Sequence, residues 1–181
     1  MEDADFVVFV DSSVLISCGR RGGARFRALS REARQRDAAF RITPAVYAEV
    51  AGDPMLDDYT VDDSAVERAL QKGWLKVTES PSYSDPDVSS VMDRAQRFIA
   101  SAGDRTEDVV ERADTEIVGL ALEMLQNDTA RRVSVLTNDV PLGNAAETLI
   151  PQYGFDDDQI VWWTGSEFAP ELDADYVSEF E

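Results

Sequence analysis

The chain has 181 residues, 44% of them apolar, and a formal net charge of -19 at neutral pH. That length and apolar content are typical of one domain with a sizeable core. The chain contains no histidine and one cysteine, Cys18, which excludes imidazole bases, Ser-His-Asp triads, thiolate zinc sites and an internal disulfide. Neither a leader-like N-terminus nor an apolar run of about 18 residues is present, so we expect a soluble, cytoplasmic protein.

The acidic composition indicates adaptation to molar intracellular salt. Asp outnumbers Glu by 22 to 14, and two lysines stand against 15 arginines. A strongly negative charge would ordinarily argue against a nucleic-acid partner. At about 1 M salt, however, the Debye length is only roughly 3 Å, so local charge decides more than the total charge.

Short apolar runs alternate with helical patterns, without a long linker or a repeat. The runs predict strands at residues 6–10, 40–42, 74–78, 133–137 and 160–163. Helices are predicted near residues 13–18, 24–36, from 44 onward, 64–72, 88–101, 109–126 and 143–149, with an exposed connection over 53–63. The alternation predicts an α/β fold with a mainly parallel sheet. We expect one domain over residues 1–181, with its core at about 5–150 and a C-terminal strand and acidic tail at 151–181.

Two predicted strands end in an aspartate. Asp11 follows the first strand, and Asp139 follows the strand at 133–137. Ligands of parallel α/β sheets sit outside the carboxyl ends of the strands, so both residues would face one crevice if their strands are neighbours. The helices that carry Glu49 and Asp114 could close that crevice. Clustered carboxylates of this kind suit Mg²⁺ or Mn²⁺.

Each of these acidic residues also has a structural explanation. Asp11 could be a helix N-cap and Asp139 a turn former. Glu49 could be an exposed helix residue, and Asp114 could pair with Arg112. For the tryptophans, we expect Trp74 in the sheet and core, and one residue of the Trp162–Trp163 pair at the surface, because adjacent strand residues face opposite sides.

The segment at 20–41 is locally basic. It holds eight arginines against Glu32 and Asp37, which gives it a charge of +6 (8 minus 2). This segment is either a solvated helix face or a surface that grips phosphates or an acidic partner. The substrate-binding candidates in it are Arg20, Arg21 and Arg25.

Five sequence stretches resemble the PIN-domain nuclease family. They are VVFVDSSVLI, ITPAVYAEV, SAVERALQKGWLKV, ERADTEIVGLALEM and SVLTNDVPLGNAAETL, in the order expected for the family. The resemblance implies a three-layer α/β/α sandwich whose acidic cluster binds Mg²⁺ or Mn²⁺. It also implies hydrolysis of phosphodiester bonds, usually in single-stranded RNA, that leaves a 5′-phosphate and a 3′-hydroxyl.

The resemblance also assigns roles to particular residues. The family's acidic positions fall on Asp11, Glu49, Asp114 and Asp139. Thr137 and Asn138 match the polar residues before the last aspartate, and Ser12 occupies the turn after the first. Glu116 is a marginal further candidate, and Val140 and Pro141 offer no further ligand, so a second metal site would be weak or completed by substrate.

Three functions remain open. The first is a metal-dependent endoribonuclease, either an RNA-processing enzyme or the toxin of a pair that an antitoxin holds. The second is a non-catalytic module that binds RNA or protein through the arginine-rich segment. The third is a metal-dependent phosphatase with Asp11 as nucleophile, although Ser13 stands where that chemistry wants a second acid. The sequence does not decide whether the chain forms a homodimer.

Overall fold

The structure is a computed structural model that describes residues 6–20, 23–51, 65–104, 106–107 and 110–172. The predicted connection at 53–63 and the tail from residue 173 lie outside these residues. No helix in the described ranges combines the length and the apolar character that crossing a membrane requires.

The centre of the fold is a five-stranded sheet in the order β3-β2-β1-β4-β5, in which every pair of neighbours is parallel. The strands are β1 (Phe6–Val10), β2 (Phe40–Ile42), β3 (Leu75–Val77), β4 (Arg132–Leu136) and β5 (Ile160–Trp163). The middle strand, β1, is almost completely buried from residue 7 to residue 10, as expected for a parallel strand covered on both faces. In the register of the sheet, Val10 of β1 lies beside Leu136 of β4, so the two strands end together.

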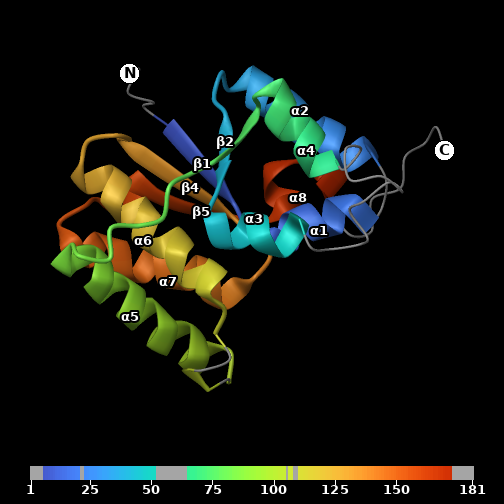
Figure 1. The fold of residues 1–181 in the computed structure, drawn as a ribbon. Coiled ribbons are helices and arrows are strands. Elements are labelled where there is room, and N and C mark those ends of the chain that lie inside the picture. The colour runs from blue at the N-terminus through green and yellow to red at the C-terminus, as the bar shows by residue number, and fades with distance from the viewer. Residues whose placement is uncertain (1–5, 21–22, 52–64, 105, 108–109, 173–181) are drawn as a thin grey trace.

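Helices cover both faces of the sheet (Figure 1). They are α1 (Ser12–Arg20), α2 (Gly23–Gln35), α3 (Pro44–Ala51), α4 (Ala65–Lys72), α5 (Pro86–Ala102), α6 (Arg112–Gln126), α7 (Val140–Leu149) and α8 (Gly165–Phe168). Figure 1 shows α5, α6 and α7 grouped on one side of the sheet and α1, α2, α4 and α8 on the other. Short 3-10 turns follow at Ile150–Tyr153, Asp157–Gln159 and Pro170–Leu172. The predicted α/β/α sandwich with a parallel sheet is therefore confirmed.

Local sequence signals explain several helix ends. The hydroxyl of Thr43 accepts a hydrogen bond from the amide of Val46 at 3.2 Å, so Thr43 caps α3, and Pro44 is the first helical residue. Gly73 ends α4 with a φ of 81°, a conformation that favours glycine.

Three boundaries and one side chain differ from the sequence predictions. Helix α6 begins at Arg112 rather than near residue 109, and α7 begins at Val140 rather than at 143, because Asp139 is its N-cap residue and Pro141 fits its first turn. Strand β3 spans only Leu75–Val77, which leaves Trp74 just outside it. Trp74 is half-buried rather than a core residue.

Candidate active site

The two predicted strand-end aspartates lie at one edge of the sheet, after the neighbouring strands β1 and β4. The amide of Asp11 donates to the carbonyl of Leu136 at 2.9 Å, which extends the β1–β4 pairing by one residue. The carbonyl of Asp11 then accepts from the amides of Val14 and Leu15, which opens α1. The chain therefore turns from a buried strand into a helix at the position where Asp11 projects.

Two hydroxyl groups hold the carboxylate of Asp11. Its Oδ2 atom accepts hydrogen bonds from Ser13 and Thr137, each at 2.8 Å. The other oxygen, Oδ1, is buried and has no hydrogen-bond partner among the described residues. Burial raises the pKa of Asp11, more than the interactions with Ser13, with Thr137 and with the backbone of Ser12 lower it. A buried acceptor without a partner is rare in native proteins and costs free energy, so this atom points to a ligand.

Thr137 organises the second strand end. It is fully buried, and its hydroxyl both donates to Asp11 and accepts from the amide of Asp139 at 3.0 Å. The neighbouring Asn138 uses its Oδ1 atom to accept from the amide of Gly165 at 2.9 Å, which ties α8 to this turn. Asp139 is the N-cap residue of α7, yet its side chain makes no capping hydrogen bond within the described residues. The structure therefore gives no support to a mere capping role for Asp139.

Trp162 supports the same turn from β5. Its indole nitrogen donates to the carbonyl of Thr137 at 3.0 Å, and its ring packs directly on Gly143 of α7. Both residues of the Trp162–Trp163 pair are partly exposed, and Trp163 packs against the core. A side chain at position 143 would occupy the space of the indole ring, which explains glycine there.

Asp114 lies in the first turn of α6 and is only 5% exposed. Burial, together with the charges of Asp11, Asp139, Glu111 and Glu49, raises its pKa from 3.8 to about 8. A carboxyl group whose pKa is raised by both burial and several like charges is typical of a functional site. We call Asp11, Glu49, Glu111, Asp114 and Asp139 the acidic cluster.

Glu49 lies on α3 and meets Glu111 at the start of α6. Its pKa is raised to about 7, mainly by burial and also by the nearby carboxyl groups of Glu111 and Asp11, although a hydrogen bond with Ser12 lowers it. A carboxyl group that lies beside a second carboxyl group ionises less readily. Ser12, in the turn after Asp11, therefore contacts the candidate site through Glu49.

Sequence reasoning did not assign Ser13 or Glu111 to the site. Ser13 donates to Asp11 and also accepts from the amide of Asn138 at 3.3 Å, so it links both strand ends. Glu111 lies three residues before Asp114, a spacing that places two helical side chains near each other. That spacing was the available signal for Glu111.

The marginal candidate Glu116 belongs to a different contact. It is 2% exposed and accepts hydrogen bonds from the amide of Ala45 at 3.2 Å, from Tyr83 at 2.9 Å and from Arg112 at 3.1 Å. Glu116 thus joins the start of α3 to α6, and its contacts position the helix that carries Glu49. Arg112 pairs with Glu116, so the structure does not support the alternative in which Arg112 pairs with Asp114.

Of the three arginines predicted to bind substrate, the structure describes the side chain of only Arg25. Arg21 and the side chain of Arg20 lie outside the described part of the chain. Arg25 is 4% exposed, and it donates to the carbonyl of Leu172 at 3.4 Å, near the end of the described residues. This contact uses Arg25 in the fold and gives no support to its proposed role in substrate binding.

The donor set suits a hard divalent cation, although the ligands are not gathered in advance. Within the described ranges, no three acidic or sulfur-bearing side chains converge closely enough to hold an ion. The acidic cluster nevertheless supplies only oxygen ligands, which Mg²⁺ and Mn²⁺ prefer. The unpartnered Oδ1 atom of Asp11 and the mutual repulsion around Asp114 are both features that a bound cation would relieve. The residues therefore fit the ion, with some movement of side chains when it binds.

Comparison with known families agrees with this geometry. The family model described as the halobacterial PIN domain matches residues 4–177, which is nearly the whole chain. The chain belongs to this family. A search of curated proteins and a search of solved structures gave no match.

Membership in the family explains two earlier observations. PIN domains are generally nucleases, a class of hydrolases, and they typically use divalent metals. A halobacterial PIN domain is also expected to carry the acidic, lysine-poor composition of proteins that work in molar salt.

Proposed function

We propose that this PIN domain is a Mg²⁺- or Mn²⁺-dependent endoribonuclease that hydrolyses phosphodiester bonds in single-stranded RNA. The observation that carries the proposal is the buried, unpartnered Oδ1 atom of Asp11 within a cluster of mutually repelling carboxylates. Such an arrangement destabilises the fold, and destabilising groups of this kind are typical of functional sites, here one that binds a cation.

Each residue of the acidic cluster and its hydroxyl neighbours has its own role in the proposed reaction. Asp11 and Asp114 would hold the ion from the buried side, with Glu49 and Asp139 completing its acidic surroundings. The ion would lower the pKa of a bound water molecule and offset negative charge on the phosphate. Thr137 and Ser13 fix the orientation of the Asp11 carboxylate through Oδ2 and so leave Oδ1 for the ion. Glu49, whose pKa is about 7, would lose its proton when the cation arrives.

The test is cleavage of a labelled single-stranded RNA pool in molar KCl with Mn²⁺, compared with an EDTA control. Asp11→Asn should abolish cutting, whereas Asp158→Asn, the same charge change at an exposed position, should leave it intact. Parallel arms with single-stranded DNA and double-stranded RNA test the substrate class. If the folded wild type cuts none of these with Mn²⁺ or Mg²⁺, the nuclease proposal fails. A non-catalytic module would then be the better explanation, with the antitoxin and homodimer ideas to be tested by co-purification and light scattering.

A further inference from the structure

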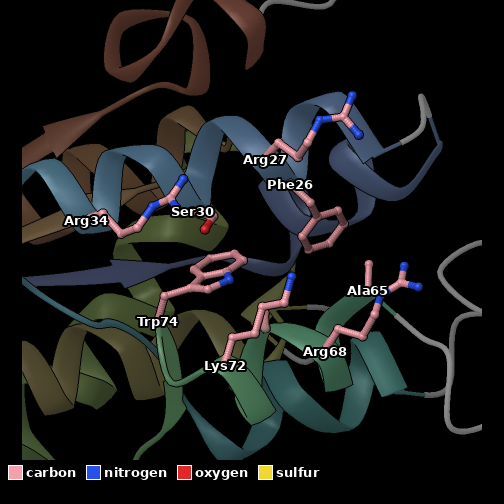
Figure 2. Close-up of a pocket in the computed structure, with 9 residues that line it drawn as sticks. Phe26, Arg27, Ser30, Arg34, Ala65, Arg68, Lys72 and Trp74 are labelled. Carbon is pink, nitrogen blue, oxygen red and sulfur yellow. The ribbon is translucent and has the colours of Figure 1, made fainter.

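A cavity of about 770 Å³ lies between α2 and α4, separate from the acidic cluster. Figure 2 shows the residues that line it, which are Phe26, Arg27, Ser30 and Arg34 from α2, Ala65, Arg68, Ala69 and Lys72 from α4, and Trp74. We call this site the α2–α4 pocket. Its volume is in the usual range for small-ligand sites, about 300 to 1,000 Å³.

The α2–α4 pocket is basic in a strongly acidic protein. Four of its nine lining residues are cationic and none is acidic, although the chain has 36 acidic residues against 17 basic ones. No ion pair is seen for Arg27, Arg34 or Lys72 within the described ranges, whereas Arg68 has an interaction of its own. Cations that the fold leaves available in an acidic surface attract an anionic ligand.

Two aromatic rings lie among these cations. In Figure 2 the rings of Trp74 and Phe26 and the amino group of Lys72 point toward the middle of the pocket, with Arg34 beside Ser30 at one end. Trp74 makes an edge-to-face contact with Phe40, with ring centroids 6.3 Å apart, and this contact fixes the orientation of the indole. A fixed aromatic ring next to cations matches the chemistry of a nucleotide, whose base stacks while its phosphate meets Lys and Arg.

The α2–α4 pocket does not overlap the acidic cluster. The carbonyl of Trp74 accepts from the amide of Phe40, where β2 begins, so Trp74 lies at the amino-terminal edge of the sheet. The acidic cluster follows the carboxyl ends of β1 and β4, at the opposite edge. Along the strand direction, Trp74 is thus separated from the acidic cluster by about the length of a five-residue strand, roughly 17 Å, which a few nucleotides of an extended strand would span.

We propose that the α2–α4 pocket binds a nucleotide of the single-stranded RNA substrate away from the bond that is cut. This inference rests on the proposed ribonuclease function and adds a second contact site for the same strand. In molar salt, long-range attraction is screened, so affinity must come from direct contacts, of which stacking on Trp74 is the least sensitive to salt.

The experiment measures binding without chemistry. A fluorescently labelled, short oligouridylate is titrated with protein in EDTA and molar KCl, and its anisotropy is followed. Trp74→Ala should weaken binding about 5- to 150-fold, the range expected for loss of one stacked base. Trp74→Phe, which keeps an aromatic ring, should bind much more tightly than Trp74→Ala. Lys72→Glu should also weaken binding, whereas Lys76→Glu, the same change at an exposed residue outside the pocket, should not.

Several results would overturn the proposal. If Lys72→Glu binds the oligouridylate as tightly as the wild type, the pocket has no part in RNA binding. Circular dichroism checks that Trp74→Ala and Lys72→Glu are folded. Competition by UMP as strong as that by the oligouridylate would make the pocket a mononucleotide site instead. Equal competition by poly-glutamate would show that it recognises acidic protein.

The two proposals fail in different ways. RNA that binds in EDTA but is never cut with Mn²⁺ would refute the nuclease and keep the α2–α4 pocket. If the wild type cuts RNA, but Lys72→Glu binds RNA as tightly as the wild type does, only the pocket proposal is refuted.

Discussion

Replacing Asp114 with asparagine should stabilise the cation-free protein. Burial and four neighbouring acidic residues raise the pKa of Asp114 from 3.8 to about 8. Between these two values the folded protein binds a proton that the unfolded chain releases, so the free energy of unfolding falls as pH rises. Each pH unit in this window costs about 1.4 kcal/mol, which sets an upper bound of about 6 kcal/mol above pH 8. Relaxation and water penetration should reduce the realised cost to about 1–3 kcal/mol.

Asparagine has nearly the same shape and no charge, so Asp114→Asn should recover most of that cost. For a domain of this size, 1 kcal/mol corresponds to about 2–4 °C in Tm, so we expect a rise of about 2–12 °C in EDTA. The rise should be larger at about pH 9 than at about pH 5, because the native carboxyl group ionises only near the top of the window.

The assay is thermal unfolding followed by circular dichroism in molar KCl with EDTA. Asp158→Asn is the matched control, since it makes the same charge change at an exposed site. The reasoning is refuted if Asp114→Asn lowers the Tm at all pH values, or if its effect equals that of Asp158→Asn throughout. Added Mn²⁺ should reverse the ranking, because the wild type gains stability from the cation and the variant gains much less.

Four further predictions concern the same region. Stabilisation by Mn²⁺ should grow as pH rises from about 6 to about 8, because Glu49, with a pKa of about 7, must lose its proton; calorimetry in two buffers should detect that proton release. Thr137→Val should cost about 1–3 kcal/mol in denaturant unfolding and most of the cleavage rate, whereas Thr137→Ser should retain both. Glu116→Ala should cost about 1–3 kcal/mol or more and weaken Mn²⁺ binding measured by calorimetry, because three donors lose their acceptor. Gly143→Ala should lower the free energy of unfolding by about 1–3 kcal/mol through overpacking against Trp162, measured by denaturant unfolding, and should change the tryptophan emission spectrum of the folded protein.

The sequence predicted the core of the site because that core depends on local patterns. A buried strand that ends in aspartate occurs twice, at Asp11 and Asp139, and parallel pairing of β1 with β4 brings the two together. Asp114 lies beside the apolar residues of its own helix, a local pattern that agrees with its 5% exposure.

The remaining features depend on contacts between distant segments. Arg25 reads as a surface arginine in its own helix, but it meets the carbonyl of Leu172 from the other end of the chain. Glu111 is the N-cap residue of α6, and its contact with Glu49 depends on how α3 meets the start of α6. The α2–α4 pocket exists only where two helices and Trp74 meet, and no local pattern describes that meeting.

Salt acts differently on the two kinds of acidic residue in this protein. Exposed residues such as Asp157 and Asp158 face the solvent, where molar salt reduces the Debye length to roughly 3 Å and screens their repulsion. Asp11 and Asp114 are 2% and 5% exposed, and buried charges are screened much less. Molar KCl therefore permits an acidic surface but leaves the repulsion within the acidic cluster in place. Protonation of Asp114 offsets that repulsion at lower pH, and a cation in direct contact with the carboxylate oxygens offsets it when the group is ionised. Cation binding thus links the stability of the fold to the proposed chemistry of the site.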